Sequence, residues 1–188
     1  YVPFHKRCLG MDALKKTVLS GPESSGKSWL SEKLALHFKA EYIPEYARIY
    51  LQKHGTSYDE DIVLQIAQEH QKFQQQGMAR AQNKVFLDTD MVNFRVWFWV
   101  AFGKTDPWIE KAIEEESDHR YLVLYPDLPW EEDPLREHPE ERQYLFERHL
   151  SEVVSLGRPY RVIRGYGEQR LSNAIEATMD LWSSPKAH

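Results

Sequence analysis

The chain has 188 residues, of which 41% are hydrophobic and 13% aromatic, enough to form the core of one compact domain. Its 29 acidic residues outnumber its 24 lysines and arginines, so we do not expect the extended basic face of a nucleic-acid-binding protein. The sequence contains one cysteine, Cys8, which excludes a disulfide within it. We expect neither a signal peptide nor a membrane insertion, and therefore a cytoplasmic protein.

Short β-prone segments alternate with helical patterns along the chain. The predicted strands cover residues 17–20, 42–44, 85–88, 121–125 and 160–164. The predicted helices cover residues 28–38, 59–81, 91–102, 140–156 and 170–182. Strands that are separated by helices favour a parallel sheet with helices on both faces. The sequence therefore predicts an α/β protein.

A segment rich in proline and acidic residues, PDLPWEEDPLREHP at residues 126–139, follows the fourth predicted strand. So polar a segment in a compact domain is either an exposed loop or a mobile lid, and its position after a strand favours a lid. We expect this lid to cover about residues 126–142. Residues 1–15 are interpreted as an N-terminal tail and residues 16–184 as one domain.

The first predicted strand leads into GPESSGKS, residues 21–28, which matches the pattern G-x-x-x-x-G-K-[ST] in full. Glycines let the backbone turn its N–H groups toward a phosphate, and the helix that follows adds the positive end of its dipole. A glycine turn that arose by chance is the alternative. We predict that the loop binds a nucleoside triphosphate, with Lys27 at the β and γ phosphates and Ser28 on Mg²⁺. The candidate nucleotide-binding residues in it are Gly21, Glu23, Ser24, Ser25, Gly26, Lys27 and Ser28.

Acidic residues close the second and third predicted strands. Ligands of a parallel sheet gather at the carboxyl ends of its strands, so Asp88 is our candidate metal ligand together with Ser28. The alternative for Asp88 and Asp90 is a carboxylate that only caps the next helix. Glu45 could accept the proton of a substrate hydroxyl, and Arg48 could bind anionic oxygen, unless the two form only a surface ion pair. The roles of Glu45 and Asp88 could also be exchanged.

The lid supplies Arg136, and Arg142 stands at the start of the next helix. Closing such cations over a phosphoryl group would stabilise developing charge and exclude water. The alternative is that they only balance the acidic residues of the lid. Three tryptophans, Trp97, Trp99 and Trp108, could stack on a flat heterocycle, but aromatic residues in an apolar helix more often belong to the core.

In this order the motifs resemble the ribosylnicotinamide kinase domain of NadR-type bacterial proteins of NAD metabolism. The resemblance covers about residues 16–182 and rests on GPESSGKS, EYAR, HQ, LDTD and WEEDPLR. It implies a three-layer α/β/α P-loop NTPase fold with a five-stranded parallel sheet and a lid. It also implies that ATP and Mg²⁺ are used to phosphorylate the 5′-hydroxyl of nicotinamide riboside, which gives nicotinamide mononucleotide.

The resemblance further implies roles for single residues. Lys27, Glu45, Asp88 and Arg136 would carry the catalysis, and Arg142 and Gly165 would lie at the nucleotide. The riboside pocket would be lined by Glu45, Tyr46, Arg48, Gln71, Asp90 and Asn93. Longer members of the family carry a DNA-binding or adenylyltransferase domain, and because only a short tail stands here, we expect neither activity.

Two other functions remain open from the sequence. A kinase for another nucleoside or nucleotide would share the loop and the acids, because the base pocket cannot be read from these motifs. A regulatory nucleotide-binding switch would use the same loop and engage a protein through the lid. Acids at two strand ends beside the loop favour a kinase with a small-molecule riboside as its partner. The acceptor, the choice between ATP and GTP, and formation of a homo-oligomer are left undecided.

Overall fold

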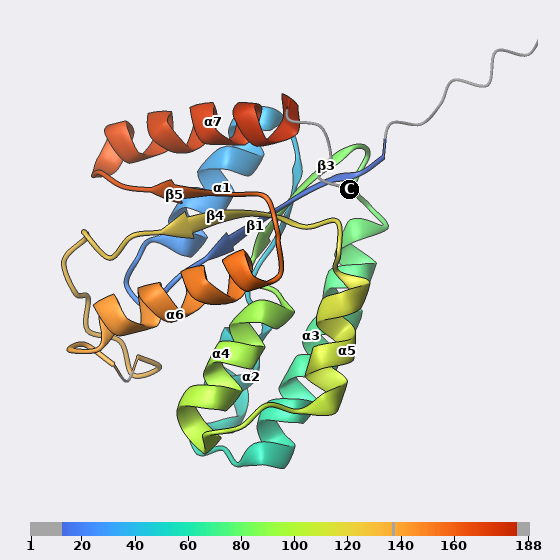
Figure 1. The fold of residues 1–188 in the computed structure, drawn as a ribbon, viewed down its shortest axis with the longest axis vertical. Coiled ribbons are helices and arrows are strands. Elements are labelled where there is room, and N and C mark those ends of the chain that lie inside the picture. The colour runs from blue at the N-terminus through green and yellow to red at the C-terminus, as the bar shows by residue number, and fades with distance from the viewer. Residues whose placement is uncertain (1–12, 137, 184–188) are drawn as a thin grey trace, which may run out of the picture.

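A computed structural model describes residues 13–136 and 138–183 of the chain (Figure 1). Most of the expected N-terminal tail and residue 184 lie outside the described residues. The first strand begins at Lys15, at the end of the segment interpreted as a tail.

The centre of the molecule is a parallel sheet of five strands in the order β2-β3-β1-β4-β5. The strands are β1 Lys15–Ser20, β2 Glu41–Ile43, β3 Lys84–Asp88, β4 Arg120–Leu124 and β5 Tyr160–Ile163. In register, Val18 of β1 lies between Leu87 of β3 and Tyr121 of β4. After β1 the chain forms β2 and β3 on one side of it, and then β4 and β5 on the other side. The loop that follows β1 therefore opens at a topological switch point of the sheet.

Helices cover both faces of the sheet (Figure 1). One face carries α1 Lys27–Phe38 and α7 Gly167–Ser183, which also pack against each other. The other layer contains α2 Tyr46–His54, α3 Glu60–Met78, α4 Met91–Phe102, α5 Pro107–Glu115 and α6 Arg142–Ser155. In this layer α2 to α5 extend beyond the sheet, so that a helical wall stands beside the strand ends. Three-layer α/β/α architecture and all five predicted strands are thereby confirmed.

The strands are apolar because both of their faces are buried. In β4, Tyr121 and Val123 belong to the core beneath α3, α4 and α6, whereas Leu122 and Leu124 belong to the core beneath α1 and α7. Such a strand shows a continuous apolar run rather than an alternating pattern, which is the signal that the sequence carries. Among the described residues, no helix combines the length and the apolar character that crossing a membrane requires.

Two helices were not predicted from the sequence, α2 and α5. The start of α5 has two features that are typical of a helix N-terminus. The side chain of Asp106 accepts from Trp108 N (2.8 Å), and Pro107 occupies the first turn. Helix α2 directly follows Glu45. The sequence of α2 shows no hydrophobic periodicity, because Ala47 is the only buried side chain of this helix.

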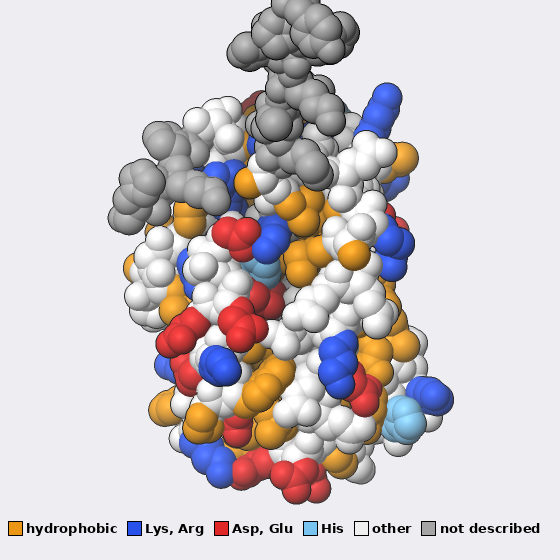
Figure 2. Space-filling view, turned by 90° about the vertical axis from the view of Figure 1, so that its right-hand side faces the viewer, with side chains coloured by type: hydrophobic (Ala, Val, Ile, Leu, Met, Phe, Trp, Pro, Cys, Tyr) orange, Lys and Arg blue, Asp and Glu red, His pale blue; other side chains and the backbone are white. Residues whose placement is uncertain are grey.

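Charged side chains of both signs share the surface. Figure 2 shows the side of the molecule formed mainly by α3 and α5, where lysines and arginines are scattered singly among acidic and apolar groups. This face therefore offers no continuous basic patch.

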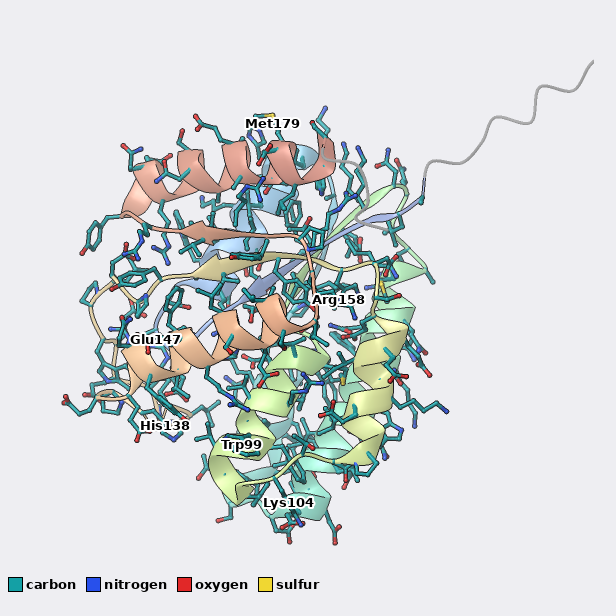
Figure 3. All side chains as sticks on the ribbon, viewed as in Figure 1. Trp99, Lys104, His138, Glu147, Arg158 and Met179 are labelled. Carbon is teal, nitrogen blue, oxygen red and sulfur yellow. The ribbon has the colours of Figure 1, made fainter. Side chains whose placement is uncertain are left out.

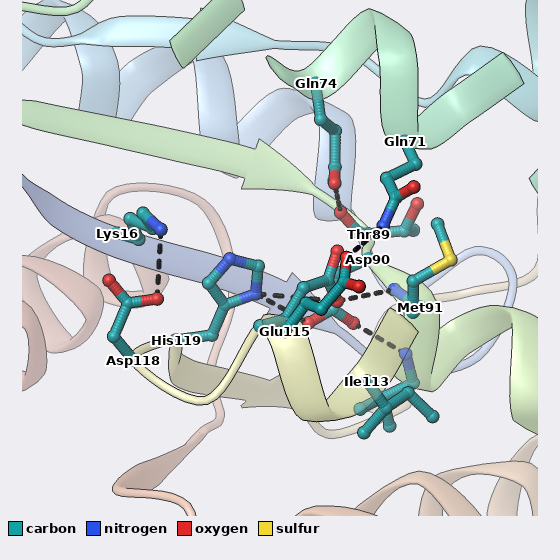
Figure 4. A network of polar contacts seen from close by, with 12 residues as sticks. Lys16, Gln71, Gln74, Thr89, Asp90, Met91, Ile113, Glu115, Asp118 and His119 are labelled. Atoms are coloured by element: carbon teal, nitrogen blue, oxygen red, sulfur yellow. Dashed lines mark hydrogen bonds and ion pairs between the residues drawn. The ribbon is translucent and has the colours of Figure 1, made fainter. Parts of the chain in front are cut away.

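A buried polar network holds the N-terminus of α4 (Figure 4). Asp90 accepts hydrogen bonds from Val92 N (3.1 Å) and Tyr121 OH (2.5 Å), and His119 Nδ1 lies 3.0 Å from it. Glu116 Oε2 accepts from Met91 N at 3.1 Å. Burial and the neighbouring Asp90 raise the pKa of Glu116 well above its ordinary value of 4.5, whereas the bonds from His119 and Tyr121 outweigh burial and lower that of Asp90. The two carboxyl groups thus share one negative charge.

This network predicts a pH-dependent effect of Glu116→Gln on stability. The raised pKa means that the folded state holds a proton on Glu116, so this contribution to stability is full below pH 4.5 and is lost as the pH rises. Glutamine keeps the acceptor for Met91 N and needs no proton. We expect a gain of about 1 kcal/mol at pH 8, roughly 2–4 °C in melting temperature, that shrinks toward pH 5.

Thermal unfolding at several pH values measures this effect. The matched control is Glu115→Gln at the neighbouring position, whose carboxylate is exposed and, within the described part of the chain, accepts from Gln71. An equal gain at pH 5 and pH 8, or a loss at pH 8, would contradict the shared-charge account.

Candidate functional site

The carboxyl ends of the strands open into a cavity of about 620 Å³. Its walls come from the loop after β1, the N-terminal half of α2, the inner face of α4, α6 and the lid segment. One end is formed by the glycine-rich loop and is polar. The other end lies between α2 and α4 and is apolar. The cavity is therefore large enough for two ligand groups placed end to end.

The loop after β1 needs its glycines for geometric reasons. Gly21 has φ +140°, and a Cβ on it would lie 2.8 Å from the carbonyl oxygen of Leu124. Gly26 precedes α1 with φ +82°, a left-handed conformation that leaves the first N–H groups of the helix facing the loop. Ser25 closes the turn by donating to Pro22 O at 2.7 Å. The loop is thus preformed as a ring of backbone donors that suits a phosphate.

A cation and a candidate metal site lie within this loop. Lys27 Nζ donates to Gly21 O and Pro22 O, both at 2.9 Å, so it is held over the loop. Ser28 Oγ donates to Asp88 Oδ2 at 2.5 Å, while the other carboxylate oxygen of Asp88 is buried and has no hydrogen-bond partner among the residues that the structure describes. A hydroxyl beside a carboxylate with a vacant oxygen is an oxygen donor set that fits Mg²⁺.

Arg170 of α7 ties the loops together behind this site. Its side chain is fully buried, and it donates to Ser25 O (2.8 Å), Tyr125 O (3.0 Å) and Gly165 O (3.0 Å). Asp127 neutralises it through an ion pair of 2.6 Å. The loops after β1, β4 and β5 are therefore held by one guanidinium group.

Glu45 is the carboxylate of the second strand end that lines the cavity. Burial, and then repulsion by Asp88, raise its pKa to about 7, although Lys27 and Arg48 oppose this. Burial likewise raises the pKa of Asp88. A carboxylate with a pKa near neutrality can accept a proton from a hydroxyl and release it again.

The lid is fastened to both ends of the cavity. Asp133 forms an ion pair with Arg48 of α2. Arg136 lines the cavity and donates to Glu131 O at 2.7 Å. His138 N donates to Glu23 Oε2 at 3.1 Å, and Figure 3 shows His138 where the lid approaches α6. The lid of this structure therefore covers the loop.

The apolar end of the cavity is lined by aromatic and aliphatic side chains. Trp97 lines it and packs edge-on against Tyr58, with ring centroids 5.0 Å apart. It also packs against the core, as the alternative for these tryptophans predicted. Trp108 packs against the core only, and Trp99 lies half-exposed on α4 under Arg148 (Figure 3).

Most candidate residues from the sequence meet at this cavity. Those that line it are Gly21, Glu23, Ser24, Ser25, Gly26, Lys27, Ser28, Glu45, Arg48, Asn93 and Arg136. Asp88 joins them through Ser28. Arg142 and Gly165 lie behind the wall, since Arg142 donates to Ser24 O (3.0 Å) and Gly165 N donates to Asp127 (2.7 Å).

Three residues that were assigned to the riboside pocket are placed elsewhere. Tyr46 donates to Glu69 at 2.5 Å, and Gln71 donates to Glu115 at 3.3 Å on the surface. Asp90 is enclosed in the network at α4 and caps that helix, which was its alternative role.

Thr89 is the reason why Asp88 and Asp90 separate. It has φ +74°, which is rare for a β-branched residue, and its carbonyl oxygen accepts from Gln74 at 2.9 Å (Figure 4). In a regular strand, residues two apart face the same side. The turn at Thr89 instead sends Asp88 toward α1 and Asp90 toward Tyr121 on the other face.

Three further residues of the site were not predicted from the sequence: His149 and Thr89, which line the cavity, and Ser20, which contacts His149. An isolated histidine or serine carries no spacing signal. For Ser20 the sequence did carry one signal, because this residue directly precedes Gly21 of the loop.

Comparison with known proteins agrees with this architecture. The profile of a family described as AAA domain (AAA_28) matches residues 16–170. The trifunctional NAD biosynthesis/regulator protein NadR of Escherichia coli K12 is 30% identical over 129 residues, 65% of this chain and 31% of its own. The chain therefore spans about a third of the length of this relative.

Two solved structures share the fold. A NadR protein in complex with NAD and AMP-PNP has a TM-score of 0.75 and 23% identity over 93% of this chain and 51% of that chain. A NadR protein in complex with NR has a TM-score of 0.71 and 21% identity, over 93% of this chain and 52% of that one. The resemblance seen in the motifs and the P-loop kinase-like fold are confirmed by these matches. The chain belongs to the AAA domain family AAA_28.

Proposed function

We propose that the protein transfers the γ-phosphoryl group of ATP to the 5′-hydroxyl of nicotinamide riboside and so forms nicotinamide mononucleotide. The observation that carries this proposal is one cavity that joins the glycine-rich loop to an enclosed pocket with a carboxylate and an aromatic wall. The similarity to NadR proteins, one of which was solved with NR, supports the choice of acceptor. The proposed place of action is the cytoplasm.

The loop is the proposed binding site of the ATP phosphates. Its backbone N–H groups and Lys27 would hold the phosphate oxygens, which requires Lys27 to exchange its carbonyl partners for the ligand. Ser28 and Asp88 are the proposed holders of Mg²⁺, which would supply positive charge against the phosphates.

Proton transfer is assigned to Glu45, or to Asp88 if their roles are exchanged. Glu45 lines the same cavity as Asn93 and Trp97, so a riboside that lies along α4 could bring its 5′-hydroxyl to this carboxylate. Trp97 and Tyr58 offer aromatic faces and edges that suit a flat cationic ring. Arg136 approaches from the lid to offset charge on the transferred group.

The proposal is tested by ADP release from Mg·ATP with and without nicotinamide riboside, using cytidine, uridine and thymidine as comparison acceptors. We expect strong stimulation by nicotinamide riboside and formation of nicotinamide mononucleotide, detected by mass spectrometry. Stimulation by another nucleoside alone would identify that nucleoside as the acceptor in place of nicotinamide riboside. Tight nucleotide binding without stimulation by any acceptor would favour the regulatory switch.

Lys27→Ala is expected to lower kcat by about 10²–10³-fold, because the substitution removes the cation that faces the phosphates. The measurement is the initial rate at saturating ATP and acceptor. Lys33→Ala, on the exposed side of α1, is the matched control. A Lys27→Ala variant with nearly wild-type activity would refute the mechanism.

Arg136→Ala is expected to lower kcat by about 10²-fold and to change the acceptor KM little, since the guanidinium acts on charge that develops during transfer. Steady-state kinetics in both substrates separate the two parameters. Arg136→Lys should recover part of the rate. A change confined to KM would assign Arg136 to ground-state binding instead.

A further inference from the structure

Three polar side chains meet at the wall of the cavity between α4 and α6. Ser20 ends β1, Asn93 lies in the first turn of α4, and His149 lies in the middle of α6. Ser20 Oγ is 3.0 Å from Asn93 Oδ1 and 3.2 Å from His149 Nδ1. Ser20 is fully buried, whereas Asn93 and His149 line the cavity. Three separate elements thus build one hydrogen-bonded chain with two ends at the cavity.

The hydrogen bonds determine what this chain presents to a ligand. Because the Ser20 hydroxyl donates its one proton to Asn93, the imidazole of His149 must donate from Nδ1. Its Nε2 is then an unprotonated acceptor. The amide nitrogen of Asn93 keeps its two N–H groups as donors. One acceptor beside one donor complements a pair of hydroxyl groups.

We propose that Ser20, Asn93 and His149 form the subsite for the hydroxyl groups of the acceptor and select an unphosphorylated riboside over its 5′-phosphate. In this arrangement Asn93 and His149 touch the acceptor, and Ser20 positions them. The inference rests on the proposed function, since it concerns the acceptor end of the same cavity.

The charges around the cavity favour an acceptor without a phosphate. Each arginine of the described cavity wall already has a carboxylate partner: Arg48 pairs with Asp133, Arg136 with Glu131 and Arg170 with Asp127. Lys27 belongs to the loop that would hold the phosphates of the donor. Burial, and then Lys27, lower the pKa of His149 to about 3, so its imidazole is neutral at physiological pH. A phosphorylated acceptor would therefore bring about two negative charges to a site without an unpaired cation.

The first test is Ser20→Ala, which removes the link without touching the ligand. We expect the acceptor KM to rise about 3- to 10-fold, the value of one hydrogen bond, while the KM for ATP stays within error. His149→Phe keeps a ring of similar size and should raise the acceptor KM at least as much. In the double variant the two effects should not add, because both break the same chain.

Thr178→Ala is the matched control. Thr178 is also a fully buried hydroxyl and donates to Ala174 O at 2.7 Å, but it lies in α7 on the opposite face of the sheet. Its substitution should leave both KM values unchanged. Should Ser20→Ala and Thr178→Ala alter the kinetics equally, the chain would have only a structural role and the proposal would fail.

The second test compares acceptors on the wild-type protein: nicotinamide riboside, cytidine and uridine against their 5′-monophosphates. Because the monophosphates have no 5′-hydroxyl to accept a phosphoryl group, they are measured as competitors of the ribosides: weak inhibition, with an inhibition constant well above the riboside KM, supports the subsite, and inhibition tighter than the riboside KM overturns it. If cytidine or uridine replaces nicotinamide riboside, the proposed function fails while the variants still test the subsite with that acceptor. If no acceptor is turned over, calorimetry with AMP-PNP present decides, and absence of riboside binding overturns the subsite as well.

Discussion

The buried guanidinium of Arg170 is the interaction on which the site depends. Backbone carbonyl groups of three loops point at it, and carbonyls that converge would repel one another and lose water without a shared donor. Asp127 balances its charge and also accepts from Gly165 N. The glycine-rich loop is thereby fixed from behind, which leaves its inner side free for a ligand. Preorganisation of the loop is thus supplied by α7, the last helix of the domain.

The sheet and the loop could be predicted because their signals are local. Gly21 and Gly26 adopt backbone conformations that other residues reach only with strain. Strands that are buried on both faces appear in the sequence as continuous apolar runs. The third strand end shows where such reasoning stops. The spacing of Asp88 and Asp90 predicts that they share a face, but the left-handed turn at Thr89, whose carbonyl Gln74 binds, separates them. That contact spans fifteen residues and leaves no periodic trace.

The end of the cavity that we assign to the acceptor depends still more on tertiary structure. Ser20, Asn93 and His149 come from three elements, and each alone resembles an ordinary polar residue. Their meeting follows from how α4 and α6 pack together beside the end of β1. Trp97 shows the same limit in another form, because its helix is apolar on nearly all sides and no pattern separates its cavity face from its core face.

The lid is fastened mainly by polar contacts at its surface. Apart from Asp127 at its start, which pairs with the buried Arg170, the lid forms an ion pair between Asp133 and Arg48, whose side chain is 40% exposed, and its other contacts include single hydrogen bonds to Glu23 and Ser24. Exposed ion pairs contribute only about 0–1 kcal/mol, and water can replace each of these bonds when the lid lifts. Opening and closing of the lid over the cavity therefore require little free energy. Escape of a product from beneath it does not require any part of the core to unfold.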